Sequence, residues 1–124
     1  MKYLCLISAT RLMEDMTPAE ATRHFQEYAE FTRELKLNGQ FVSANRLRPP
    51  SEATTVRVRH GEILTTDGPY AETKEQLGGY FVIDAQDLNA AIRIAARIPA
   101  ATFGSIELRP IADDAETLAL AFDV

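Results

Sequence analysis

The N-terminal residues 2–8 place the strongest constraint on what this chain can fold into. Apolar side chains occupy both alternating sets of positions, namely Tyr3, Cys5 and Ile7 on one side and Leu4 and Leu6 on the other. A β-strand has this pattern when both of its faces are covered. Residues 2–8 are therefore predicted to form a central strand of a sheet that is buried on both sides.

A long amphipathic helix is predicted to follow. Thr17 is suited to cap its N-terminus, Pro18 to occupy the first helical position, and Glu20 to close a capping box. At about 100° per residue, one stripe faces the core and comprises Ala21, His24, Phe25, Tyr28, Phe31, Thr32 and Leu35. The helix is expected to end at Asn38-Gly39, because glycine readily adopts the left-handed conformation found at helix ends.

The remaining elements are a second helix, three strands and a hairpin. Asp87 is predicted to cap the helix and Pro99 to end it, with a buried face of Leu88, Ala91, Ile92, Ala95 and Ile98. Strands are predicted at residues 41–47, 79–84 and 105–111, and the 79–84 strand is expected to pair with the first. Residues 54–59 and 62–66 flank His60-Gly61, a pattern typical of a β-hairpin with a tight turn.

The order of these elements defines the predicted fold class. It is a βαββαβ plan with an inserted β-hairpin, an α+β sandwich in which two helices cover one face of an antiparallel sheet. Residues 1–112 are expected to form this domain and residues 113–124 a C-terminal tail. Because the strands are apolar on both faces, two protomers are predicted to pack sheet against sheet as an isologous homodimer. The tail, with Leu118, Leu120 and Phe122, is expected to dock on a partner chain.

Composition narrows the classes of function. The formal net charge of −5 argues against unaided binding of nucleic acid. The single cysteine, Cys5, excludes an internal disulfide and is expected to pack as a small buried residue. Two histidines in different elements form no recognised ligand spacing, so neither a metal nor another cofactor is expected. The N-terminal apolar run is too short to span a bilayer and lacks a signal-peptide layout, so a cytoplasmic location is expected.

Residues 67–79 concentrate the candidate chemistry, and they are predicted to form one wall of a pocket. Gly68, Gly78 and Gly79 leave room for a ligand or another chain to approach the backbone. Asp67, at the end of a predicted strand, is the candidate general base. The alternative is that its side chain stabilises its own turn.

Other side chains are candidate partners of Asp67. Tyr28 or His24, on the core-facing stripe of the first helix, would share the proton transfer, although such residues are also common as hydrogen-bonded core members. The candidate substrate-binding residues are Glu72, Lys74, Tyr70 and Arg57, and charged residues in such a segment are alternatively just solvated. The arginines Arg46, Arg57 and Arg59 either recognise an anion together or form an exposed strand face that discourages edge pairing.

Two stretches carry a family resemblance: ATTVRVRHGEILTTDGPYAETKEQLGGYFVIDA and AARIPAATFGSIELRPI. They resemble the YCII-related proteins of the DGPF subgroup, whose Asp-Gly-Pro-Phe motif here reads Asp67-Gly68-Pro69-Tyr70. The resemblance runs from Met1 to about Ile111 and implies a ferredoxin-like fold built as a dimeric α+β barrel. It also implies, for the wider family, an enzymatic role resting on a His and Asp pair. The position of that histidine falls near Tyr28, and His24 lies one turn earlier.

Two classes of function remain open. The first is an enzyme that works by acid-base chemistry on a small anionic substrate, with Asp67 as base, Tyr28 or His24 as its partner, and Lys74 or Arg57 orienting the substrate. The second is a non-catalytic metabolite-binding or regulatory protein. The resemblance implies its association with an extracytoplasmic-function sigma factor, because DGPF proteins often accompany such factors in genomes.

Overall fold

A four-stranded antiparallel sheet forms the centre of the computed structural model, which describes the backbone of residues 1–122 and the side chains of residues 1–120. The strands are β1 (Lys2–Ala9), β2 (Phe41–Arg46), β5 (Gln76–Asp84) and β6 (Ser105–Pro110), in the order β2-β5-β1-β6. In β1, Cys5 lies opposite Phe81 of β5 and Leu108 of β6. This order of four strands is the ferredoxin-like arrangement, and the predicted fold class is confirmed.

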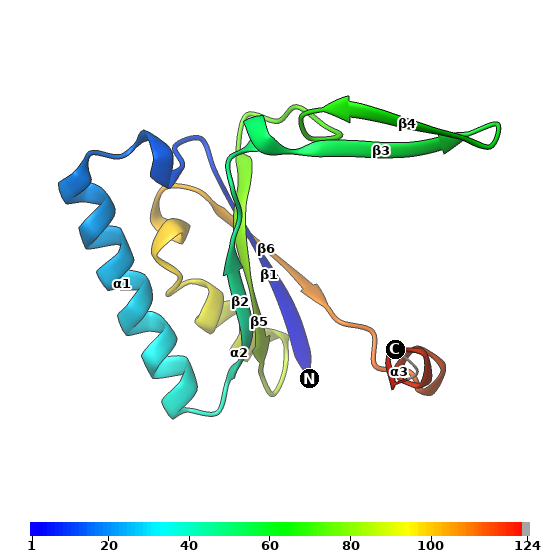
Figure 1. The fold of residues 1–124 in the computed structure, drawn as a ribbon. Helices are drawn as coiled ribbons and strands as arrows, with labels where there is room; N and C mark the ends of the chain where they lie inside the picture. The colour runs from blue at the N-terminus through cyan, green and yellow to red at the C-terminus, as the bar shows by residue number, and fades with distance from the viewer. Residues whose placement is uncertain (123–124) are drawn as a thin grey trace.

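The two predicted helices, α1 (Pro18–Leu37) and α2 (Leu88–Ala95), lie on one face of the sheet (Figure 1). The predicted capping box is confirmed: Thr17 accepts a hydrogen bond from the Glu20 amide at 3.2 Å, and Glu20 accepts one from the Thr17 amide at 3.1 Å. At the other end of α1, Gly39 has a φ of +68°, as its role as a helix terminator requires.

The buried face of α2 differs from the prediction. Ala91, Ala95 and Ile98 are buried as expected, but Ile94 is buried as well, whereas Leu88 and Ile92 are 52% and 48% exposed. Apolar residues surround most of this short helix, so their periodicity alone did not define which side faces the sheet. The helix also ends at Ala95, and Pro99 begins a separate turn, η3 (Pro99–Thr102).

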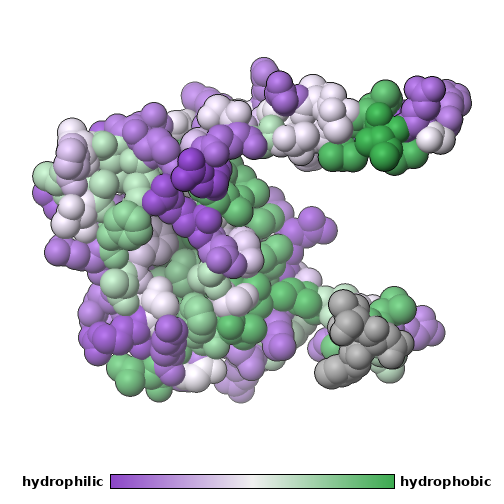
Figure 2. All heavy atoms as spheres, in the orientation of Figure 1, coloured by the Kyte–Doolittle hydropathy of each residue, from purple (hydrophilic) through white to green (hydrophobic). Residues whose placement is uncertain are grey.

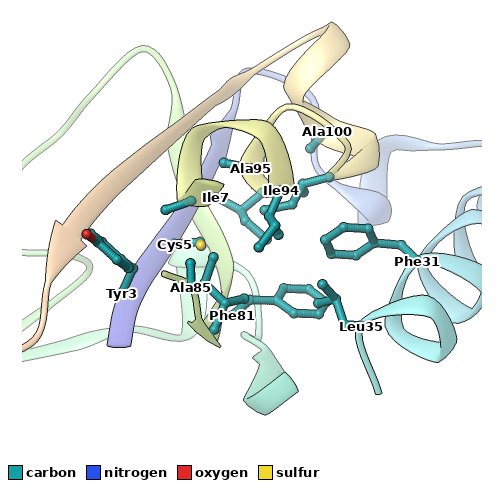
Figure 3. Close-up of a cluster of buried hydrophobic side chains, with 13 residues drawn as sticks. Tyr3, Cys5, Ile7, Phe31, Leu35, Phe81, Ala85, Ile94, Ala95 and Ala100 are labelled. Atoms are coloured by element: carbon teal, nitrogen blue, oxygen red, sulfur yellow. The ribbon is translucent and has the colours of Figure 1, made fainter. Parts of the chain in front are cut away.

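The hydrophobic core lies between the helices and the sheet (Figure 3). Phe81 is at its centre: its ring makes edge contacts with Phe31 at 5.3 Å and Phe41 at 6.4 Å between centroids. Cys5 is fully buried beside these residues, and burial raises the pKa of its thiol to about 11. The prediction that Cys5 packs as a small buried residue is therefore confirmed.

The inserted hairpin consists of β3 (Thr54–Arg59) and β4 (Glu62–Asp67), which pair only with each other in the part of the chain that the structure describes. His60 and Gly61, between the strands, have φ values of 52° and 76°. Positive φ at both turn positions defines a type I′ turn, which suits the twist of a two-stranded ribbon. The hairpin projects from the sheet on the side opposite to α1 and α2 (Figure 1).

The C-terminal segment forms a short helix, α3 (Ala115–Phe122), on the same side of the sheet as the hairpin (Figure 1). Asp114 accepts a hydrogen bond from the backbone amide of Thr117 at 3.0 Å, which satisfies one of the free amides of the first turn. Leu118 and Leu120 are 43% and 71% exposed. The side chain of Phe122 lies outside the described part of the chain. None of the helices within residues 1–122 combines the length and apolar character needed to cross a membrane.

Candidate functional site

A cavity of about 230 Å³ lies between the N-terminal half of α1 and one end of the sheet. Its floor comes from β1, β2 and β5, and its walls come from α1, from η3 and from the segment that connects β1 to α1. The lining is mostly apolar and includes Ile7, Ala9, Leu12, Met13, Met16, Phe25, Ala44, Leu47, Phe81, Ala100 and Phe103. The polar residues among the lining residues are Arg11, Glu14, His24, Tyr28, Asn45, Arg46 and Tyr80, of which Asn45 and Tyr80 are paired residues of β2 and β5 that alternate with those facing α1.

Two glycines of β5 make the cavity floor possible. A Cβ atom on Gly79 would lie 2.9 Å from the carbonyl oxygen of Asn45, and one on Gly78 would lie 3.0 Å from the side chain of Leu12. Both contacts are too close for any larger residue without local rearrangement. The expected close approach to these glycines is therefore made by the chain's own β2 strand and connecting segment.

The segment between β1 and α1 is fixed to the helix by an ion pair. The Arg11 guanidinium donates hydrogen bonds to both carboxylate oxygens of Glu20, at 2.7 and 2.8 Å. It also donates one to the carbonyl oxygen of Asp15 at 3.2 Å. The arginine holds the pKa of the Glu20 carboxyl at about 2, so this pair keeps its charges at neutral pH and positions the segment over the cavity.

His24 and Tyr28 are adjacent on the cavity wall formed by α1. Their ring centroids are 4.8 Å apart in an edge-to-face arrangement, and both side chains are half-buried. Burial lowers the pKa of His24, although Glu27 acts in the opposite direction. Burial raises the pKa of Tyr28 to about 12, partly opposed by a backbone hydrogen bond from Ala100. At neutral pH the imidazole can therefore accept a proton, and the phenol can donate a hydrogen bond.

Arg46 supplies a positive charge at the same cavity. Its guanidinium lies 3.3 Å from a carboxylate oxygen of Glu14 and 5.8 Å from the centroid of the Phe25 ring. The guanidinium group also contacts the sulfur of Met13 at 3.3 Å. The pair with Glu14 is single and partly exposed, so its contribution to stability is small. Replacing the Glu14 carboxylate by an incoming anion as the partner of Arg46 would therefore cost little free energy.

A β-bulge explains why Arg46 faces the helices. Phe41 lies opposite Ile83, but Ser43 lies opposite the next residue of β5, Val82, so β2 contains one extra residue. Beyond this bulge the alternation is reversed, and Arg46 lies opposite Gly79 on the side of α1. Arg57 and Arg59 lie on the separate β3–β4 sheet, so they share no strand face with Arg46.

The structure divides the predicted site residues between two places. His24 and Tyr28 line the cavity. Asp67 ends β4, Arg57 lies in β3, and the connector from the hairpin to β5 carries the remaining three, Tyr70, Glu72 and Lys74. All five of these residues are exposed, Tyr70 by 82%, and none is among the residues that line the cavity. Within residues 67–79, Gly78 and Gly79 are the ones that reach it.

Sequence reasoning did not single out Met13, Glu14 or Phe103. The ring of Phe103 contacts that of His24 at 5.7 Å between centroids, a tertiary contact that no local sequence pattern indicated. The segment of Met13 and Glu14 had no periodic pattern, so nothing in it indicated that it would cover the cavity. No three His, Cys, Asp or Glu side chains in the described part of the chain gather closely enough to hold a metal ion.

The fold and the cavity define a ferredoxin-like α+β protein with a largely apolar cavity between its first helix and its sheet. The family model of the YCII-related domain matches residues 1–114, and the chain belongs to the YCII-related family. It is also 37% identical over 95 residues to an uncharacterised protein of Rhizobium meliloti (strain 1021). That alignment covers 75% of this chain and 77% of its relative.

Proposed function

We propose that the cavity binds a small molecule with an apolar body and one anionic group, and that His24 and Tyr28 act on it by acid-base chemistry. The observation that carries this proposal is the pairing of a neutral imidazole and a neutral phenol within a single apolar cavity that also contains Arg46. Ligand pockets are commonly about 300–1,000 Å³. A volume of about 230 Å³ therefore suits a small metabolite rather than a large cofactor.

Each polar group has a distinct part in the proposed reaction. Arg46 pairs with the anionic group of the substrate, for which a planar guanidinium is well suited. His24 accepts a proton from the substrate, and Tyr28 donates a hydrogen bond to the oxygen that becomes more negative. The reaction class is proton transfer next to a carbonyl or similar group. The base role of Asp67 and the binding roles of Arg57, Tyr70, Glu72 and Lys74 stay predictions.

The proposed anion specificity can be tested with a thermal-shift screen of small carboxylates and carbonyl compounds. A ligand that binds the native state stabilises it by about 2.7 kcal/mol at 100 times its dissociation constant. Arg46→Met should remove the shift produced by an anionic hit, while Arg57→Met, on the exposed hairpin, should keep it. Loss of the shift with Arg57→Met and its retention with Arg46→Met would place the anion at the hairpin instead.

A second candidate is a non-catalytic metabolite-binding protein. It is favoured by the position of Asp67, the predicted base, which is exposed at the end of β4 and does not line the cavity that contains His24 and Tyr28. The Asp67-Gly68-Pro69-Tyr70 motif supports membership of the DGPF subgroup. On that basis, a cytoplasmic regulatory protein that acts with an extracytoplasmic-function sigma factor is the corresponding proposal. A ligand that binds at the cavity and is recovered unchanged after long incubation would favour this second candidate.

A homodimer is proposed on the basis of the uncovered face of the sheet. Tyr3, Cys5 and Ile7 of β1 point into the core, so the alternate residues Leu4 and Leu6 point to the opposite face. Their neighbours on that face are Val82 and Tyr80 of β5, and no helix covers them in Figure 1. An apolar sheet face of this kind is suited to pack against a second copy.

Light scattering should give twice the chain mass of 13.8 kDa, and a monomeric mass at micromolar concentration would contradict the proposal.

A further inference from the structure

A second cavity, of about 430 Å³, adjoins the cavity described above. Its lining is more polar, and most of its residues are exposed. The residues that line both cavities are Arg11, Met16, His24 and Phe103. Side chains that line two cavities stand between them. These four residues therefore form a shared wall, with the apolar first cavity on one side and the polar second cavity on the other.

Phe103 has a fixed place in the shared wall. Its amide donates a hydrogen bond to the carbonyl oxygen of Ala100 at 3.2 Å, and the amide of Gly104 donates one to the same oxygen at 2.7 Å. A Cβ atom on Gly104 would clash with the carbonyl oxygen of Ser8, so glycine is what lets this turn approach the end of β1. The ring of Phe103 contacts that of His24 on α1. Phe103 therefore connects the end of β1 to α1 and closes the space between them.

Arg46 lies at the opposite end of the first cavity. It is opposite Gly79 of β5, and Gly79 is opposite Ile7 of β1. Neighbouring strands are about 4.8 Å apart, so the backbone of Arg46 lies about 10 Å across the sheet from β1. The groups around its guanidinium are Met13, Glu14 and Phe25. None of these three residues lines the second cavity. A ligand whose anionic group binds Arg46 therefore extends its apolar body across β5 towards the shared wall.

We propose that Phe103 sets the maximum length of the ligand by closing the first cavity at the end remote from Arg46. This inference rests on the proposed function, in which the ligand combines an apolar body with one anionic group. Phe103 contributes only an apolar ring to the shared wall, whereas Arg11 binds Glu20 and His24 has a part in the proposed reaction. The ligand class is a short-chain carboxylate whose tail ends at the Phe103 ring. A longer acid would have to displace that ring, which costs free energy as overpacking does.

A series of straight-chain carboxylates, from acetate to decanoate, tests this limit by titration calorimetry. Each methylene buried in the first cavity should raise the affinity about fourfold. Beyond the length at which the tail reaches Phe103, the affinity should stop rising or fall. Phe103→Ala should move this break to longer acids and raise the affinity for the first acid beyond the wild-type break at least about tenfold. Phe103→Leu should move it less. A break at the same length in all three proteins would overturn the proposal.

The matched control is Phe25→Ala. Phe25 is 52% exposed, close to the 46% of Phe103, but it lines only the first cavity of the two. Its removal should change the affinity for all of the acids by a similar factor and leave the break at the wild-type length. An equal movement of the break in Phe25→Ala and Phe103→Ala would mean that the limit is not specific to the shared wall, and it would overturn the role given to Phe103.

The β3–β4 hairpin offers an alternative surface for an alkyl chain. Figure 2 shows hydrophobic surface along its outer part, and Ile63 is 75% exposed there. Ile63→Asn should leave the affinities and the break unchanged, while Arg46→Met should weaken binding of every acid. Binding that is lost in Ile63→Asn and kept in Arg46→Met, or no binding of any acid to the wild-type protein, would overturn the proposed function and the length limit together. Binding that depends on Arg46 but shows no movable break would overturn the length limit alone.

Discussion

Replacing Phe81 with alanine should lower the free energy of unfolding by about 3–5 kcal/mol. The side chain is 5% exposed, and its ring contacts those of Tyr28, Phe31 and Phe41. Removing it leaves a void between the central strand β5 and α1 that the surrounding sheet cannot close. Urea unfolding measures the loss directly.

The control for Phe81→Ala is Phe103→Ala. Phe103 also lines the cavity but is 46% exposed. Removing its ring should therefore lower the free energy of unfolding markedly less than Phe81→Ala does. Equal losses for the two variants would contradict the central place of Phe81 in the core. Equal losses would also mean that the contacts of the Phe81 ring contribute little to the free energy of unfolding.

Replacing His24 with glutamine should lower kcat by about 10²- to 10⁴-fold for any substrate whose turnover depends on the cavity, the range typical of a lost general base. Glutamine retains hydrogen-bonding capacity but cannot take up the proton. Because burial lowers the pKa of His24, the wild-type rate should be full above the ordinary value of 6.5 and should fall only below it, as the imidazole becomes protonated. A stopped assay across this pH range measures both effects.

Asp67→Asn is the informative comparison for His24→Gln. Asp67 is exposed at the end of β4, whereas His24 contacts Tyr28 inside the cavity. The proposed mechanism predicts that the Asp67→Asn variant keeps the wild-type kcat, while the kcat of His24→Gln falls. Loss of turnover in Asp67→Asn, with His24→Gln unaffected, would restore Asp67 as the base and contradict the role given to His24.

Local sequence signals predicted the fold well because each of them depends on neighbouring residues. The Thr17 to Glu20 capping box and the His60-Gly61 turn act over four residues or fewer, and both form as expected. The apolar pattern of residues 2–8 identified the central strand for the same reason. The buried face of α2 was less well predicted, because apolar residues on several sides of a short helix leave its rotation to tertiary packing.

The candidate site was harder to predict because tertiary structure assembles it. Arg46 faces the cavity only because the bulge after Phe41 reverses the alternation of β2, and no turn residue marks that bulge. Residues 67–79 are rich in charge and glycine, yet the hairpin projects away from the sheet and leaves Asp67, Glu72 and Lys74 exposed. His24 and Tyr28 were identified because both lie on the core-facing stripe of α1, where a polar group is uncommon.

The proposed functional site is the cavity between α1 and the sheet. NMR chemical-shift mapping with an anionic hit from the thermal-shift screen tests it most directly. Saturable shifts are expected at His24, Tyr28, Arg46 and Gly79, with little change at Asp67 or Lys74. Shifts confined to the Asp67 to Lys74 segment, with the cavity residues unchanged, would contradict it.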